Sequence, residues 1–480
     1  MMKRKPKILL FFYRFMEFRL FFQTGMLDEL AKSANPIVVV PAKAAPSVQQ
    51  LVGEQITVVS TSLGKSTVLE EFGGSGFQAS LARFFALIYA TNRDASHNIT
   101  AKLHLTAIQA NANSTLKKWK FSALKLATSI VSRYLFLRHF IQFIFRATNR
   151  NEQIAKIISR YKPDLVVTGS FGVSSDGLVL LEAQRKNILT AVVLQSWDRT
   201  SSKGYPTVTP DHVIVWSDVT ANETNQFLDI PSHRIYVDGA PLWDEFFRDP
   251  CPISRKSFYK MFGMNINYPF VVLAMNSLAY HQGNLDVIKE IANKTSWDKA
   301  GTKLQILIRL HPSYFSADRE KKEMEELVSA LKFEKHVFID RPRLVSEEDG
   351  LLFTKEDQKI QASSFYHCLL TISCVSTYMI ESSIFNKPAI NLEFGRWHTN
   401  LYDIDLSEYK VQHLQRIYDY GAVYRISSLD ELLPTINHIA ENPTERAAER
   451  KKLIDVEIPI NRGTAGNAYC TRLLEIALAK

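Results

Sequence analysis

Cysteine is scarce in this chain, and the spacing of the few cysteines excludes the usual cysteine-based sites. The 480 residues include four, Cys251, Cys368, Cys374 and Cys470, with no Cys-x-x-Cys or Cys/His arrangement. Zinc sites and thiol redox sites need such spacing. Cys368 and Cys374 lie in apolar runs, where free thiols are common. The sequence therefore predicts no metal site and a reducing compartment.

Long uncharged apolar runs are also missing. No stretch reaches the 18 or so residues that a membrane-spanning helix needs. The N-terminus, MMKRKPKILLFFYRFMEFRLFF, has basic residues before an apolar stretch, as a signal peptide does. Arg14, Glu17 and Arg19 interrupt that stretch, however, and no small-residue cleavage site follows. We therefore expect a β-strand over Lys7–Phe12 and a cytoplasmic protein, with peripheral attachment to the inner face of the cytoplasmic membrane as an open alternative.

Acidic residues are absent from one region. Residues 117–150 contain eight Lys/Arg and no Asp/Glu. This segment fits an anionic membrane surface, with its aromatic side facing the lipid. It also fits a helix pair with an apolar stripe in the core and a solvated basic face, which the sequence alone favours. Nucleic-acid binding is disfavoured because no known binding module accompanies the charge. The interleaved aromatic residues are Trp119, Phe121, Tyr134, Phe136, Phe140, Phe143 and Phe145.

The remaining composition is that of a globular protein, with 46% hydrophobic and 22% charged residues. A chain of this length usually folds as more than one domain. Short apolar, β-branched runs alternate with stretches of helical spacing, which is typical of parallel strands covered by helices on both faces. We therefore predict an α/β fold with doubly wound sheets. The first series of runs is KILLFF, PIVVVPA, ITVVST, DLVVTGS, TAVVLQS, HVIVWSD and RIYVDGA.

A second series of apolar runs follows a polar, Pro-bearing stretch at 244–260. Such a stretch is typical of a domain boundary. We therefore predict an N-terminal Rossmann-like domain over 1–248, a C-terminal one over 249–455, and a last helix over 456–480; the resemblance described below implies that this helix packs back towards the first domain. The second-series strands are expected at Phe270–Ser277, Leu304–Pro312, His336–Pro342, Cys368–Cys374 and Pro388–Phe394.

Ligands of open parallel sheets gather where the strands end, beside the free N–H groups of the following helices. In the second domain, Ser376 and Thr377 are placed to contact a phosphate, although either could simply cap a helix. Glu381, one turn on, is placed to accept hydrogen bonds from a ribose. His311-Pro312 leaves an imidazole at the rim of the sheet. Besides His311, the residues expected to contact such a phosphate- and ribose-bearing ligand, called the donor-binding residues below, are Ser277, Arg309, Ser373, Ser376, Thr377 and Glu381.

In the first domain, the stretch SWDRTSSKG follows the run TAVVLQS. Asp198 is a candidate general base that takes a proton from a hydroxyl. Trp197 offers a flat aromatic face for stacking, and Lys203 a cation for an anion. The alternative, left open, is a structural Asx-turn with a buried tryptophan. Asp244 is a weaker second candidate for the base. The favoured interpretation of this residue is an acid that stabilises a helix N-terminus.

Several of these motifs resemble those of a known family. His311-Pro312 followed by SCVSTYMIESSIFNKPAINL is similar to the donor domain of GT-B glycosyltransferases. This group is related to CDP-glycerol glycerophosphotransferases, CMP-sugar transferases and UDP-GlcNAc 2-epimerases. SWDRTSSKG, PDHVIVWSD and RIYVDGAPLWDEFF resemble a pattern in bacterial surface-polysaccharide proteins. Arg199 departs from that pattern, which usually has Asn there.

The resemblance implies two facing Rossmann-like domains with a cleft between them, and transfer of a nucleotide-activated sugar to a cell-surface glycan or lipid-linked acceptor. It implies His311 as a catalytic or phosphate-holding residue. No Asp-x-Asp motif lies between two predicted strands, so we expect metal-independent catalysis. Polyol-phosphate transfer, nucleotide-sugar epimerisation and a non-catalytic nucleotide-sugar-binding role remain alternatives. The expected acceptor-binding residues are Arg19, Trp197, Thr200 and Lys203.

Overall fold

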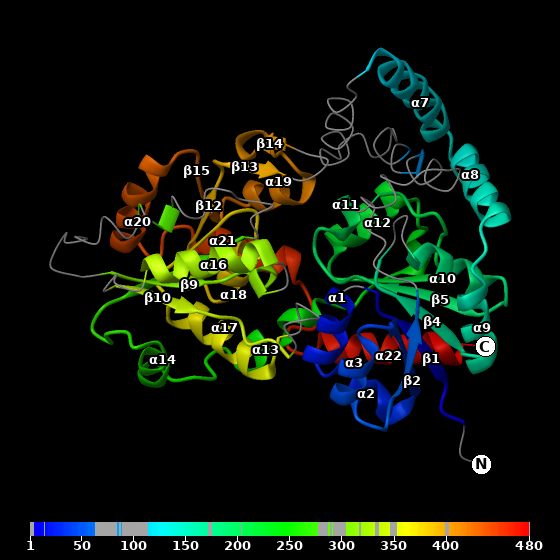
Figure 1. The fold of residues 1–480 in the computed structure, drawn as a ribbon, viewed down its shortest axis with the longest axis horizontal. Helices are drawn as coiled ribbons and strands as arrows, with labels where there is room; N and C mark the ends of the chain where they lie inside the picture. Colours follow the sequence, from blue (N-terminus) through cyan, green and yellow to red (C-terminus); the bar gives the residue numbers. More distant parts are fainter. Residues whose placement is uncertain are drawn as a thin grey trace. The chain divides into compact units, whose positions relative to one another are not determined.

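The computed structural model divides into two compact parts (Figure 1). Unit 1 comprises Met1–Asp244, Val411–His413 and Glu457–Lys480, and unit 2 comprises Glu245–Lys410 and Leu414–Val456. The residues that the structure describes are 4–13, 15–62, 84–85, 88, 114–170, 175–202, 204–276, 287–288, 290, 304–315, 318–331, 336–345, 353–398 and 403–479.

The sheet of unit 1 is parallel throughout, in the order β3-β2-β1-β4-β5-β6-β7. Its inner strands are short, apolar and buried on both faces, as the uninterrupted runs predict. The sequence order reverses between β1 and β4. The strands are β1 (Lys7–Phe11), β2 (Asn35–Pro41), β3 (Thr57–Thr61), β4 (Leu165–Thr168), β5 (Leu189–Val193), β6 (His212–Val215) and β7 (Ile235–Val237).

Helices α9 and α10 of unit 1 bury apolar side chains against this sheet. Ile154 and Ile158 of α9 and Val179 of α10 join Leu9 and Val166 of the central strands in one core cluster. The helices are α1 (Phe15–Phe18), α2 (Met26–Ser33), α3 (Ala45–Val52), α7 (Thr115–Arg133), α8 (Leu135–Thr148), α9 (Glu152–Tyr161), α10 (Ser175–Gln184), α11 (Arg199–Ser202), α12 (Asp218–Leu228) and α22 (Ala465–Leu478). A short π-helix, Arg19–Gln23, follows α1.

The last helix, α22, belongs to unit 1 and is held there by polar contacts. The Asp244 carboxylate accepts hydrogen bonds from the N–H groups of Ala465 (3.0 Å) and Gly466 (2.8 Å), which lie in the first turn of α22. Asp238 forms an ion pair with Arg472 of the same helix, at 3.1 Å. The Asp244 carboxylate therefore stabilises the N-terminus of a helix that lies far from Asp244 in the sequence.

Unit 2 has a second parallel sheet, in the order β10-β9-β8-β11-β12-β15. It also contains a two-stranded antiparallel hairpin, β13 and β14. The strands are β8 (Phe270–Ala274), β9 (Gln305–Arg309), β10 (Val337–Asp340), β11 (Thr371–Ser373), β12 (Ala389–Leu392), β13 (Arg396–His398), β14 (Asp403–Asp405) and β15 (Val423–Ile426). The helices are α13 (Asp244–Arg248), α14 (Arg255–Phe262), α16 (Asp318–Leu331), α17 (Lys355–His367), α18 (Tyr378–Ile384), α19 (Gln412–Asp419), α20 (Leu432–Glu441) and α21 (Ala447–Glu457).

These two sheets confirm the predicted α/β class, and each predicted run contains a strand. The sequence pattern does not predict β15 or the β13–β14 hairpin. β15 lies at the edge of its sheet and exposes Arg425, whose guanidinium pairs with Glu393 at 2.5 Å. A four-residue edge strand with a charged residue lacks the continuous apolar pattern of a buried strand. The predicted cleft between the domains stays a prediction.

Candidate functional site

Both sheets have the strand order of a doubly wound fold. Numbered within its own sheet, each begins 3-2-1-4-5-6, so the winding direction changes between the first and fourth strands. Ligands of such sheets bind at the carboxyl ends of the strands, at this point of reversal. It lies between β8 and β11 in unit 2 and between β1 and β4 in unit 1.

The reversal point of unit 2 contains a buried hydroxyl with no partner. Ser373 ends β11 and is only 1% exposed. Among the described residues, no group hydrogen-bonds to its Oγ. Close by, the side-chain amide of Asn276, which follows β8, donates to the backbone carbonyl of Cys374. Because a buried, unpaired hydroxyl is costly, the Ser373 hydroxyl is a position where a ligand oxygen or a water would be favourable.

The turn after β11 has an unusual backbone. Val375 has φ +47°, a left-handed conformation that costs energy for a β-branched residue. Its N–H donates to the Asn391 side chain, at 2.9 Å, which fixes the turn. Ser376 Oγ then accepts a hydrogen bond from Tyr378 N at 3.3 Å, whereas Thr377, the residue before α18, makes no side-chain capping bond. Of these two side chains, Ser376 is therefore the one that caps the start of α18.

His311 follows β9 and is half-buried. Burial lowers the pKa of its imidazole to about 4, so the ring is neutral near pH 7. A neutral imidazole both donates and accepts a hydrogen bond, but it brings no positive charge to a phosphate. Pro312 begins a short 3-10 helix, Pro312–Phe315, which takes the chain away from the sheet.

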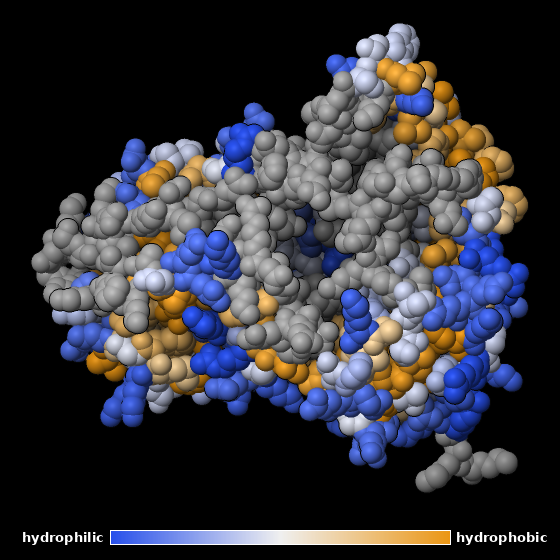
Figure 2. All heavy atoms as spheres, viewed as in Figure 1, coloured by the Kyte–Doolittle hydropathy of each residue, from blue (hydrophilic) through white to orange (hydrophobic). Residues whose placement is uncertain are grey.

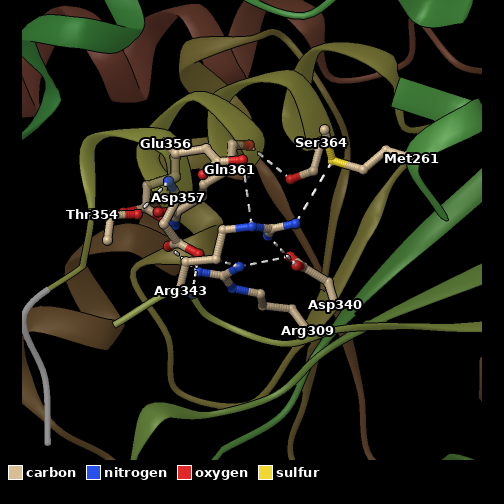
Figure 3. A network of polar contacts seen from close by, with 10 residues as sticks. Met261, Arg309, Asp340, Arg343, Thr354, Glu356, Asp357, Gln361 and Ser364 are labelled. Carbon is tan, nitrogen blue, oxygen red and sulfur yellow. Dashed lines mark hydrogen bonds and ion pairs between the residues drawn. The ribbon is translucent and has the colours of Figure 1, made fainter. Parts of the chain in front are cut away.

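Arg309 points into the domain and is held by two carboxylates (Figure 3). Its Nη1 lies 2.7 Å from Asp340 Oδ2 and 3.0 Å from Asp357 Oδ1, and its Nη2 also bonds Asp357. The Arg343 backbone N–H adds a fourth bond, to Asp357 Oδ1 at 2.8 Å. This network joins the ends of β9 and β10 to α17. The guanidinium is thus engaged within unit 2.

Glu381 is also buried. It lies on α18, is 2% exposed, and accepts a hydrogen bond from Gln361 Nε2 of α17 at 3.3 Å. Its carboxylate therefore contacts a neighbouring helix, and ribose binding by Glu381 stays a prediction. Ser277, another expected donor contact, lies outside the described residues.

At the reversal point of unit 1, a buried carboxylate lies where the sequence pattern indicates no site. Glu17 of α1 is 1% exposed, and its Oε1 accepts a hydrogen bond from Gln195 Nε2 at 2.9 Å. Gly169, after β4, permits this contact, because a Cβ there would lie 1.4 Å from Gln195 Nε2. Burial, with the Glu17 charge, raises the pKa of Tyr13 well above its usual value.

Three buried polar atoms at the carboxyl ends of β1, β4 and β5 have no partner among the residues that the structure describes. Within the described part of the chain, Tyr13 Oη, Thr168 Oγ1 and Gln195 Oε1 make no hydrogen bond. We call Tyr13, Glu17, Thr168 and Gln195 the β1–β4 cluster. The signal for it in the sequence is the charged residue itself, because Glu17 interrupts the apolar stretch FYRFMEFRLFF.

The residues after β5 are engaged in local structure. Trp197 is 4% exposed, which fits the buried alternative. The Asp198 carboxylate accepts a hydrogen bond from Ser202 Oγ at 3.1 Å, across α11. Thr200 of α11 is fully buried, and its hydroxyl bonds to Glu223 of α12. Arg19 lies elsewhere in unit 1, in the π-helix after α1, and its Nε donates a hydrogen bond to the Gln23 side chain at 3.1 Å. Lys203 lies outside the described residues.

An Asp-x-Asp sequence does occur in the antiparallel hairpin, which the sequence pattern does not predict. It is Asp403–Asp405, which forms β14 itself. Asp405 Oδ1 accepts hydrogen bonds from Ser407 N (2.9 Å) and Ser407 Oγ (2.6 Å), and these bonds lower its pKa. Over the described ranges, no group of three or more His, Cys, Asp or Glu side chains is arranged to hold a metal ion.

Comparison with solved structures decides the fold. No protein-family model and no curated protein sequence matches the chain. UDP-GlcNAc 2-epimerase from Neisseria meningitidis, solved with UDP-GlcNAc bound, is similar with TM-score 0.55 and 12% identity over 98% of this chain and 100% of that one. A putative UDP-N-acetylglucosamine 2-epimerase from Listeria monocytogenes gives TM-score 0.53 and 10% identity over 99% and 97%. A glycosyltransferase from Rickettsia africae gives 0.50 and 13% over 98% of both chains.

The chain has the GT-B fold. At 10–13% identity, the similarity to these structures shows the GT-B fold alone. They include epimerases and a glycosyltransferase, so the GT-B fold by itself does not select a reaction.

Proposed function

We propose that the protein acts on a nucleotide-activated sugar, and that it is a glycosyltransferase which delivers this sugar to a cell-surface glycan or lipid-linked acceptor. The observation that carries the proposal is the unpaired, buried Ser373 hydroxyl at the reversal point of unit 2. The doubly wound sheet binds nucleotides at this position in other proteins. Ser373 would donate a hydrogen bond to a phosphate oxygen of the donor.

The remaining roles follow from the chemistry of glycosyl transfer. A base removes the proton of an acceptor hydroxyl, the acceptor oxygen forms a bond to the anomeric carbon, and the bond to the nucleotide phosphate breaks. His311, as a neutral imidazole, would donate a hydrogen bond to the departing phosphate. Two carboxylates of unit 1, Asp198 and Glu17, are the candidate bases. Glu17 has the better environment because it is buried beside unpaired polar atoms.

The donor site is tested by thermal unfolding of the full chain with CMP, CDP, UDP, GDP and their sugar or glycerol conjugates. A ligand that binds only the folded state raises the melting temperature. Ser373→Ala should leave the ligand-free protein about as stable as the wild type, because it removes an unpaired hydroxyl. It should also reduce the shift caused by the nucleotide.

Ser383→Ala is the matched control. Ser383 lies on α18, is buried, and donates to the backbone carbonyl of Met379 at 2.9 Å, so its hydroxyl is already used. This variant should keep the full nucleotide shift. If no nucleotide stabilises the wild type, or if both variants respond as the wild type does, the donor site is not at Ser373.

Nucleotide-sugar epimerisation is the second candidate, because the Neisseria epimerase, which was solved with UDP-GlcNAc bound, shares the fold. Incubation with UDP-GlcNAc and no acceptor separates the two reactions. An epimerase yields a second UDP-sugar, seen as a new anomeric proton signal by NMR, with the nucleotide still attached. A transferase yields free nucleotide only when an acceptor is present. Binding of the donor without either product would support the non-catalytic alternative.

Metal-independent catalysis remains part of the proposal. Turnover should survive EDTA, and Asp405→Asn should leave it unchanged, because the Asp405 carboxylate is occupied by Ser407. Loss of turnover in EDTA with recovery in Mg²⁺ or Mn²⁺ would contradict this part. It would leave the assignment of the donor untouched.

A further inference from the structure

Helix α8 is turned so that its aromatic side faces outward. Phe136, Phe140 and Phe143 follow one another at helical spacing and are 67%, 54% and 63% exposed. On the opposite face, Arg138 and Gln142 are 2% and 7% exposed. A surface helix of a water-soluble domain normally has the reverse arrangement, with its apolar side chains inside.

The inward polar residues of α8 are satisfied by unit 1. The Arg138 guanidinium pairs with Asp229, at 2.5 and 3.0 Å, and Asp229 also accepts a hydrogen bond from Tyr205 Oη at 2.6 Å. Gln142 Nε2 donates to the backbone carbonyl of Pro206 at 2.9 Å. Because these buried groups are all paired, they hold the polar face of α8 against the rest of unit 1. The phenylalanines on the opposite face of α8 therefore point outward.

Helix α7 continues the exposed apolar surface. Leu116, Trp119, Leu126 and Ile130 are 65%, 73%, 66% and 52% exposed. Their spacings of three, seven and four residues put them on one side of the helix. Figure 2 shows hydrophobic atoms gathered along the α7 and α8 region of unit 1. Contiguous apolar surface of this kind usually marks an interaction site.

The charge of the same segment selects the partner. Residues 117–150 carry eight Lys/Arg and no Asp/Glu, and Lys118, Lys120, Lys125 and Arg133 are exposed. A second copy of this chain would bring like charges together across the contact, which is unfavourable. A partner surface that is both apolar and anionic would match the apolar side chains and the basic side chains of α7 and α8. An anionic lipid bilayer is such a surface, and aromatic and basic side chains are the groups that bind it.

We propose that α7 and α8 form a membrane-binding surface, with Trp119 and the α8 phenylalanines in the headgroup region and the exposed lysines against anionic lipid. Both helices would lie in the plane of the membrane. In the part of the chain that the structure describes, no helix has the length and hydropathy to cross a bilayer. The proposal does not depend on the nucleotide-sugar reaction.

Sedimentation of the full chain with lipid vesicles tests the proposal. The vesicles are of phosphatidylcholine alone or of equal parts phosphatidylcholine and phosphatidylglycerol. We expect binding to the mixed vesicles at least about tenfold tighter than to phosphatidylcholine alone, weakened by added salt. Replacing Phe136, Phe140 and Phe143 together by Ser should reduce binding at least about tenfold. The charge reversals Lys118→Glu, Lys120→Glu and Lys125→Glu should do the same.

Two controls keep the test decisive. Leu51 and Met261 are exposed apolar residues elsewhere, at 39% and 42%, so Leu51→Ser with Met261→Ser should bind vesicles as the wild type does. Tryptophan emission should shift to shorter wavelength on mixed vesicles, and Trp119→Phe should abolish most of the shift. Equal binding to both vesicle types, or undiminished binding by the phenylalanine variant, would overturn the proposal. A dimer in sedimentation velocity that this variant dissociates would overturn it as well.

Discussion

Glu17 accepts a hydrogen bond from Gln195, a residue 178 positions later in the chain. Both residues follow strands of the same parallel sheet, β1 and β5, and β4 lies between those strands. Gly169, which follows β4, leaves the space in which the two side chains meet. The sheet topology therefore builds a buried polar cluster from three segments that are remote in sequence.

Gly169→Ala should be strongly destabilising. The new Cβ would lie 1.4 Å from Gln195 Nε2 and 2.5 Å from Glu17 Cγ, so both side chains must move. Overpacking of this kind costs about 1–3 kcal/mol of unfolding free energy. Urea unfolding measures it. In the Gln195→Ala background the same substitution should cost less, and an unchanged cost would show that the contact with Gln195 is not responsible.

Glu17→Gln tests which carboxylate acts as the base. The substitution keeps the size of the side chain and its ability to accept from Gln195, so stability should change little. If Glu17 is the base, turnover should fall by about 10²–10⁴-fold, with the nucleotide-induced thermal shift retained. Asp198→Asn is the matched variant. A large loss of turnover there, with Glu17→Gln active, would assign the base to Asp198.

The Arg309 network should be sensitive to removal of one charge. Arg309→Met leaves the Asp357 carboxylate buried without its cation and leaves Asp340 with only the longer ion pair to Arg343, at 3.6 Å; breaking a buried pair typically costs about 3–5 kcal/mol. The urea midpoint should fall accordingly. The exposed pair of Lys32 and Glu29 is the control, because water already solvates both groups and Lys32→Met should barely move the midpoint. Equal effects would contradict a structural role for Arg309.

His311 should make stability depend on pH in acid. Its pKa is about 4 in the folded protein and about 6.5 when unfolded, so the unfolded chain binds more protons between these values. The His311 contribution to stability is therefore complete above about pH 6.5 and is lost as the pH falls towards 4. His311→Gln should lose less stability than the wild type as the pH is lowered through this window, measured by urea midpoints. Parallel losses would contradict a half-buried imidazole that stays neutral down to about pH 4.

The strands can be predicted because buried parallel strands are apolar on both faces, so each appears as an uninterrupted run. The same property prevents prediction of where a strand's polar residue points. Arg309 ends such a run, and its direction is set by Asp340 and Asp357, which come from other segments. Glu17 likewise acquires its partner through the topology of the sheet.

The orientation of α8 cannot be predicted from its own residues for a related reason. Its pattern favours an aromatic stripe in the core, because apolar faces usually pack inward. The structure shows that this interpretation is wrong for Phe136, Phe140 and Phe143, which are exposed. The outcome depends on Asp229, which binds Arg138 and so holds the polar face inside. A distant acid therefore determines which face of the helix is exposed.

The position of α22 has a consequence for synthesis of the protein. Unit 1 begins at the N-terminus but includes Glu457–Lys480, so most of unit 2 is translated before unit 1 has all of its parts. Tyr469, Leu473 and Ile476 of α22 are buried in the finished protein. Until they leave the ribosome, the surface that they cover stays open and exposed to aggregation. A nascent chain would thus complete its second unit first and its first unit last.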